Sequence, residues 1–242
     1  METVFWTVMG ILFAISLKLT TRWHHELGMG PFEPGKAWPV IDRLLAVTHW
    51  GMIGYLLLVK YGSGTMLYIL QPCHIVMVLQ GTLLMLKPSR VTRGLLHAHF
   101  VLILGAFVAI VLPDTDTLEA PFEVEVFFIQ HFLIVFVTPL RLLKLHDGGH
   151  WRWISVLGGL CIMHLMHWPF YVTTGSLTHV NLQFMQCPTV ALAEILKELP
   201  PWVITPSYRS LVTILYHIVA IGVAAGYLEL GRFLFTRKTK SS

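Results

Sequence analysis

The chain has 242 residues, of which 55% are hydrophobic and only 12% are charged, and its mean hydropathy is +0.68. Because a soluble domain averages about 25% charged residues, this composition excludes an ordinary soluble protein and indicates a membrane protein. The formal net charge of +4 would suit nucleic acid in a soluble chain. Here we interpret it as topology information and expect no nucleic-acid partner.

Seven segments satisfy or approach the length of about 20 mostly apolar residues that a membrane-spanning helix needs. They are 3–19, 44–61, 64–86, 94–112, 123–142, 153–174 and 208–231. The first is short, and in a six-span alternative it lies in the membrane interface. No linker, charge block or internal repeat divides the chain. The sequence therefore predicts an all-α polytopic helix bundle that forms a single domain over residues 1–242.

The loops predict the orientation of this bundle. Of the 17 Lys and Arg residues, 14 follow the first, third, fifth or seventh span. Short loops rich in Lys and Arg stay cytosolic, so we expect the amino terminus on the lumenal or outer side and the carboxyl terminus in the cytosol. The six-span alternative keeps every later orientation.

Polar side chains recur at one depth in several predicted spans. Cys73, His131 and His217 each lie nine residues from the outer start of a span, and His167 and His164 lie eight and eleven residues from the outer end of another. At a rise of 1.5 Å per residue, nine residues correspond to roughly 13–14 Å. A single buried histidine is usually a packed core residue. Several spans that bring such groups to one level predict a site in the outer half of the membrane.

The segment YILQPCHIVMVLQG, residues 68–81, carries the most unusual group of polar residues. Pro72 lacks an N–H, and inside a helix it clashes one turn back. We expect it to free the carbonyl group of Tyr68 and to kink the span just before Cys73. Gln71 and His74 are three residues apart and are predicted to share one side of the helix, with Cys73 about 100° away from His74.

A thiol and an imidazole at this depth predict nucleophilic chemistry. If the third and fifth spans touch, His131 accepts the proton of Cys73 and creates the nucleophile. Gln130 either orients the His131 ring or donates to an oxyanion, and His167 or His74 is a candidate third partner. The natural reaction is acyl transfer, in which the thiolate attacks an ester carbonyl and a second nucleophile collects the chain. A lysolipid acceptor would make the protein a transferase, whereas water would make it a lipid hydrolase.

Other chemistries lack their motifs. The sequence has no glycine-rich phosphate loop, no GxSxG and no CxxC. His164 and His167 share a helical face at ligand spacing, but no HExxH and no carboxylate at that depth completes a set, so we expect no metal and no cofactor. A transporter is the alternative from another class. It would need a polar path to both faces, and the inner halves of the third and fifth spans, IVMVL and FLIVFV, predict none.

Three blocks of this sequence resemble one known family. They are YILQPCHIVMV (68–78), PFEVEVFFIQHFLIVFVTPL (121–140) and THVNLQFMQCP (178–188). With their order and spacing, the chain resembles the transmembrane protein 164 family of membrane acyltransferases, and more distantly the androgen-induced membrane hydrolases. The resemblance implies transfer of a polyunsaturated chain from a diacyl phospholipid onto a lyso ether phospholipid. It also implies that Cys73 and His131 are the catalytic pair.

The carboxyl-terminal residues RKTKSS place Lys238 and Lys240 near the end of the chain. This spacing is typical of a cytosolic dilysine retrieval signal, which predicts the endoplasmic reticulum membrane. The alternative is a basic anchor at the cytosolic interface.

Overall fold

The structure, a computed structural model, describes residues 11, 14–15, 18, 39–115, 118–147, 153–182, 188, 190–198 and 208–236. Within these ranges every regular element is a helix, which confirms the all-α prediction. Five helices are long and apolar enough to cross a membrane, over 39–62, 91–111, 123–146, 156–178 and 213–235, and Pro72–Met85 is a shorter apolar helix. Most of the predicted first span 3–19 lies outside the described residues, as do Lys238 and Lys240. The count of seven spans, the single domain and the orientation remain predictions.

The observed helices follow the predicted spans closely at most positions. In chain order they are α2 (Pro39–Gly62), η2 (Met66–Leu70), α3 (Pro72–Met85), α4 (Arg90–Leu102), α5 (Leu104–Val111), α6 (Glu123–Phe132), η3 (Leu133–Val137), α7 (Thr138–Leu142), η4 (Leu143–Asp147), α8 (Trp153–Leu165), η5 (Met166–Val172), α9 (Thr173–Thr178), α10 (Val190–Lys197) and α12 (Tyr208–Thr236). The third span is the exception, because it is divided into the 3₁₀ turn η2 and the helix α3.

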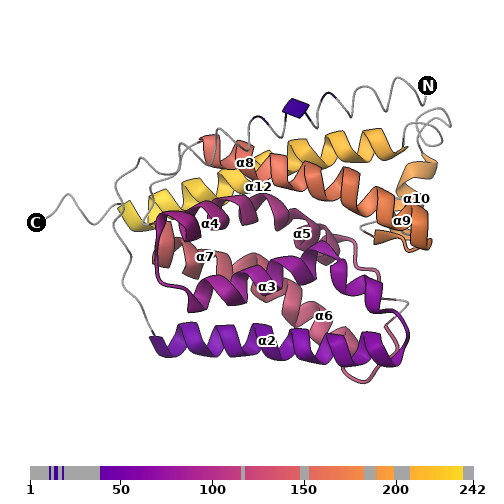
Figure 1. Cartoon of the computed structure of the whole chain (residues 1–242), viewed down its shortest axis with the longest axis horizontal. Helices are drawn as coiled ribbons and strands as arrows, with labels where there is room; N and C mark the ends of the chain where they lie inside the picture. Colours follow the sequence, from indigo (N-terminus) through magenta and orange to yellow (C-terminus); the bar gives the residue numbers. More distant parts are fainter. Residues whose placement is uncertain are drawn as a thin grey trace, which may run out of the picture.

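The helices pack side by side from α2 at one edge of the bundle, through α3 and α4, to α8 and α12 at the other edge (Figure 1). Helix α2 lies along one edge and packs on α3, and α4 packs on α3, α8 and α12 at the opposite edge. The contact between α4 and α8 is close at Gly159, where an added Cβ would lie 3.1 Å from the Cα and carbonyl oxygen of Ala98. Small residues commonly let membrane helices approach in this way.

Two buried ion pairs join α2 to the long helix that runs from α6 through η4. Arg141 binds Asp42 through two hydrogen bonds of 2.5 and 2.8 Å, and Lys60 lies 2.8 Å from Glu123. Both pairs span 18 residues along their helices, so they lie about 27 Å apart at 1.5 Å per residue. This separation is close to the hydrocarbon thickness of about 30 Å.

The long α6–η4 helix contains a wider π-helical turn, η3, that begins two residues after His131. Such a turn leaves carbonyl oxygens without their usual partners, and side chains from other helices donate to two of them here. Gln80 of α3 donates to Ile134 O at 2.9 Å, and the Tyr227 hydroxyl of α12 donates to Val135 O. The segment that carries His131 is therefore held from both sides.

Candidate active site

The chain breaks its helix immediately before Cys73. Residues 66–70 form a 3₁₀ turn, Gln71 has the extended angles φ −56° and ψ 143°, and Pro72 is the first residue of α3. The predicted continuous helix over 64–86 with an internal proline kink is therefore wrong. At the first helical position the missing N–H of proline costs nothing, because that donor has no intrahelical acceptor.

This break places Cys73 in the first turn of a 14-residue helix. The amino-terminal end of a helix carries a partial positive charge and free N–H groups, which is where reactive cysteines are found. Cys73 is half-buried and packs against the core. The prediction that Gln71 and His74 share a helical side is also wrong, since half-buried Gln71 precedes the helix.

The predicted free carbonyl of Tyr68 is not observed, because two donors bind it. The Nδ1–H of His74 donates to Tyr68 O at 3.0 Å, and the Gln71 N–H donates to the same oxygen at 3.1 Å. The Tyr171 hydroxyl donates to Leu70 O at 3.0 Å. His74 and Tyr171 therefore stabilise the turn that precedes Cys73.

The structure brings the segment Gln130–His131 of α6 to the start of α3. Gln130 interacts with the side chain of Cys73, and His131 interacts with His74. Within the described residues no hydrogen bond joins Cys73 to His131, so the catalytic pair remains a prediction. In ligand-free structures catalytic hydrogen bonds are often long and tighten only when substrate binds.

The local contacts of His131 fix which ring nitrogen is available. Its Nδ1–H donates to the carbonyl oxygen of Phe127 at 2.6 Å, and its ring lies 4.2 Å from the Phe127 ring. A neutral imidazole has one N–H, so this bond leaves Nε2 with a lone pair. The side chain is buried at 2% exposure, and its orientation suits a general base.

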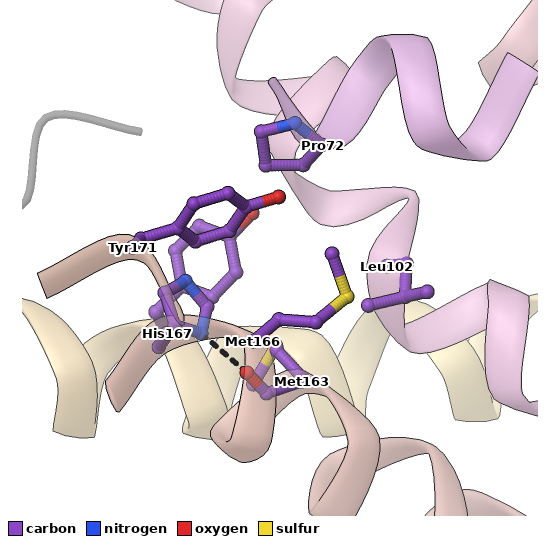
Figure 2. A pocket seen from close by; sticks show the side chains of 7 residues that line it. Pro72, Leu102, Met163, Met166, His167 and Tyr171 are labelled. Atoms are coloured by element: carbon purple, nitrogen blue, oxygen red, sulfur yellow. Dashed lines mark hydrogen bonds between the residues drawn. The ribbon is translucent and has the colours of Figure 1, made fainter. Parts of the chain in front are cut away.

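His167 lines a small cavity that Pro72, the first residue of α3, also lines (Figure 2). Its Nδ1–H donates to Met163 O at 2.9 Å, and the cavity beside it holds about 10 Å³, room for roughly one water. The lining residues are Pro72, Leu102, Met163, Met166, His167, Tyr171 and Tyr216. Both His167 and Tyr171 belong to η5. Tyr171 interacts with Cys73, whereas His167 faces the cavity.

The remaining histidines of the predicted layer also lie close to one another. His164 and His217 have ring centroids 5.6 Å apart, and His167 and His217 are 6.3 Å apart. In the part of the chain that the structure describes, no group of three or more His, Cys, Asp or Glu side chains has the geometry to hold a metal ion.

Sequence reasoning missed two features near the site. Lys60 lies close enough to Cys73 and His74 to interact with both electrostatically, although it is 13 residues away along the chain. A buried polar cluster also lies deeper in the bundle, where Gln80 bonds to His49 at 3.1 Å and to His99 at 3.0 Å. The polar residue directly after IVMVL was its only signal in the sequence.

Comparison with known proteins gives a family for nearly the whole chain. The sequence profile of the TMEM164 family matches residues 2–222. The Transmembrane protein 164 homolog of Dictyostelium discoideum is 25% identical over 183 residues, which are 74% of this chain and 64% of that protein. The chain thus spans less than two thirds of that relative. No solved structure matches.

Proposed function

The chain belongs to the TMEM164 family, and from this premise we propose that it is a membrane acyltransferase that moves a fatty acyl chain between phospholipids through a thioester on Cys73. The observation that carries the proposal is the position of Cys73 in the first turn of α3, half-buried and facing the Gln130–His131 segment of α6. Gln130 lies beside Cys73, and the candidate base His131 is the next residue along α6. The resemblance implies the same pair.

The reaction has two half-reactions that balance without a cofactor. The His131 Nε2 takes the thiol proton, and the Cys73 sulfur attacks the ester carbonyl carbon of a donor phospholipid. The C–O bond breaks, and the leaving lysophospholipid oxygen takes the proton from His131. The hydroxyl of an acceptor lysophospholipid then gives its proton to His131 and attacks the thioester carbonyl carbon. The C–S bond breaks, and the Cys73 sulfur takes the proton from His131 and becomes a thiol again.

The depth of the site supports a lipid substrate. His131 lies eight residues beyond Glu123, so it is about 12 Å from the Lys60–Glu123 end of the bundle. Phospholipid esters and the first acyl carbons lie at this level and reach the site from the side. The apolar surroundings exclude most water, which favours transfer to a lysolipid over hydrolysis. A lyso ether phospholipid acceptor, a polyunsaturated chain and the endoplasmic reticulum membrane complete the proposal.

Substitution of the pair tests this proposal. In proteoliposomes with a labelled diacyl phospholipid and an unlabelled lysophospholipid, we expect Cys73→Ala to abolish transfer. We expect His131→Ala to lower it by about 10²–10⁴-fold, the usual contribution of a positioned acid–base. The wild-type protein should form a labelled, hydroxylamine-sensitive thioester on Cys73.

Cys161→Ala is the matched control, because Cys161 is buried in α8 away from the break before α3. It should retain the thioester and the transfer rate. Turnover by Cys73→Ala would disprove the mechanism. Release of free fatty acid without any acylated acceptor would identify a lipid hydrolase that uses the same pair.

A further inference from the structure

Gln130 is a buried polar residue whose role the two half-reactions leave open. Its side chain is 1% exposed, and its Nε2 has no hydrogen-bond partner among the described residues. Leaving a buried donor unpaired destabilises the folded protein. A polar group left in this state in a packed bundle needs an explanation, and a ligand that is absent from the resting site is one.

Orientation of the His131 ring does not explain this amide. The ring is already fixed within α6, because its Nδ1–H donates to Phe127 O at 2.6 Å and its face packs on the Phe127 ring. The Gln130 carboxamide lies beside the Cys73 thiol instead, outside hydrogen-bond distance. Of the two roles that the sequence left open for Gln130, the structure favours donation at the nucleophile.

A second donor lies at the same place. The N–H groups in the first turn of a helix have no intrahelical acceptor. Those of His74 and Ile75 both donate to Gln71 O, at 3.0 and 3.2 Å. The N–H groups of both His74 and Cys73 lie beside the Cys73 sulfur. The backbone N–H of the nucleophile and an amide from α6 therefore converge on the sulfur.

We propose that Gln130 Nε2 and the Cys73 N–H form the oxyanion hole of this site, which makes Gln130 a further catalytic residue. The inference rests on the proposed function. When the thiolate adds to the ester carbonyl, the C=O electron pair moves onto oxygen and both groups donate to that oxyanion. Collapse returns the pair and expels the lysolipid oxygen. The same two donors serve the second half-reaction, because attack of the acceptor hydroxyl on the thioester carbonyl again places a negative charge on the carbonyl oxygen.

Gln130→Met tests the proposal, because it keeps an unbranched side chain of similar length and removes the donor. We expect kcat to fall by about 10²–10³-fold, as when other oxyanion donors are removed, with KM for the donor lipid little changed. Gln130→Asn keeps an amide and should retain part of the rate. Ile129→Met is the matched control, since the neighbouring Ile129 is 52% exposed, and it should transfer at the wild-type rate.

Alkylation of Cys73 by iodoacetamide separates catalysis from packing. Alkylation consumes the thiolate but forms no oxyanion, so its rate should fall far less than the transfer rate in Gln130→Met. Transfer rates are expressed per alkylatable Cys73, which removes any misfolded fraction. A wild-type rate of thioester formation in Gln130→Met would overturn the proposal. A parallel loss of alkylation and transfer would also overturn it, because Gln130 would then act only by holding the thiol.

The two failures are distinguishable. If wild-type protein forms no thioester at all, the proposed acyltransferase is wrong. If wild-type protein forms the thioester and Gln130→Met forms it equally fast, only the assignment of Gln130 is wrong.

Discussion

Four histidines in this bundle make the same local hydrogen bond through Nδ1, and they differ in what surrounds Nε2. His49, His131, His167 and His217 each donate Nδ1–H to the carbonyl oxygen four residues earlier, at 2.6–2.9 Å. This contact satisfies one ring nitrogen inside the apolar bundle and leaves Nε2 for another group. The Nε2 of His49 meets the side chain of Gln80, whereas that of His131 is left for chemistry. The same residue type thus serves structure in one place and a candidate base in another.

His74 belongs to the structural group, although it adjoins Cys73. Its Nδ1–H donates to the Tyr68 carbonyl, which also accepts the Gln71 N–H. We expect His74→Phe to lower the free energy of unfolding by about 0.5–1.5 kcal/mol, the net contribution of one hydrogen bond. Transfer per folded molecule should fall far less than in His131→Ala. Thermal unfolding in detergent and a transfer assay measure both effects. An unchanged melting temperature with lost transfer would instead place His74 in the chemistry.

At the scale of elements, the π-helical turn η3 depends on donors from other helices. Gln80 joins Ile134 O, His49 and His99, so one side chain connects α3 to α2, α4 and η3. Tyr227 supplies a single bond to Val135 O. Because η3 begins at Leu133, two residues after His131, these donors also fix the position of the candidate base along the helix axis and the direction in which its side chain points.

Substitutions at these two donors should differ in their cost. Gln80→Leu leaves Ile134 O and His99 Nε2 unpaired, whereas His49 Nε2 keeps the Thr138 hydroxyl. Tyr227→Phe leaves only Val135 O unpaired, and each unpaired group costs about 1–3 kcal/mol. We therefore expect the melting temperature to fall more in Gln80→Leu than in Tyr227→Phe, measured for both in the same detergent. Equal shifts would show that the Gln80 cluster is not an energetic centre of the bundle.

The sequence predicts the helices better than it predicts the contacts between them. Apolar runs located the spans because burial in lipid requires them, and Pro72 correctly marked an irregularity in the third span just before Cys73. The same proline did not reveal that α3 starts there, because a proline without an N–H is found both at a kink inside a helix and at the first position of a new helix. Lys60 and Glu123 are 63 residues apart, and no local pattern predicts that they pair. Gln80 was overlooked because a single amide beside an apolar run is compatible with many environments.

At the scale of the whole molecule, the two ion pairs of α2 lie near opposite ends of that helix, so they define two depths along the bundle. Lys60–Glu123 and Asp42–Arg141 lie about 27 Å apart along antiparallel helices, near the two boundaries of a hydrocarbon layer. Cys73 interacts with Lys60, so the candidate site lies nearer that end. The Gln80 cluster lies between the two pairs, since His49 is seven residues from Asp42 and eleven from Lys60. This arrangement agrees with a site in one leaflet, as the spacing of the polar residues predicts.

The orientation of these levels across the membrane is a prediction from the basic loops, and it can be tested without any activity. The loop between α3 and α4 carries Lys87, whereas the acidic loop before α6 carries Leu118. Because basic loops remain in the cytosol, the Lys60–Glu123 end and the candidate site should face the lumen. In sealed microsomes of a protein whose native cysteines are replaced by alanine, a membrane-impermeant maleimide should label Lys87→Cys directly. It should label Leu118→Cys only after permeabilisation. The reverse pattern would place the site in the cytosolic leaflet, and the acceptor lysophospholipid would then have to reach it from the cytosolic side.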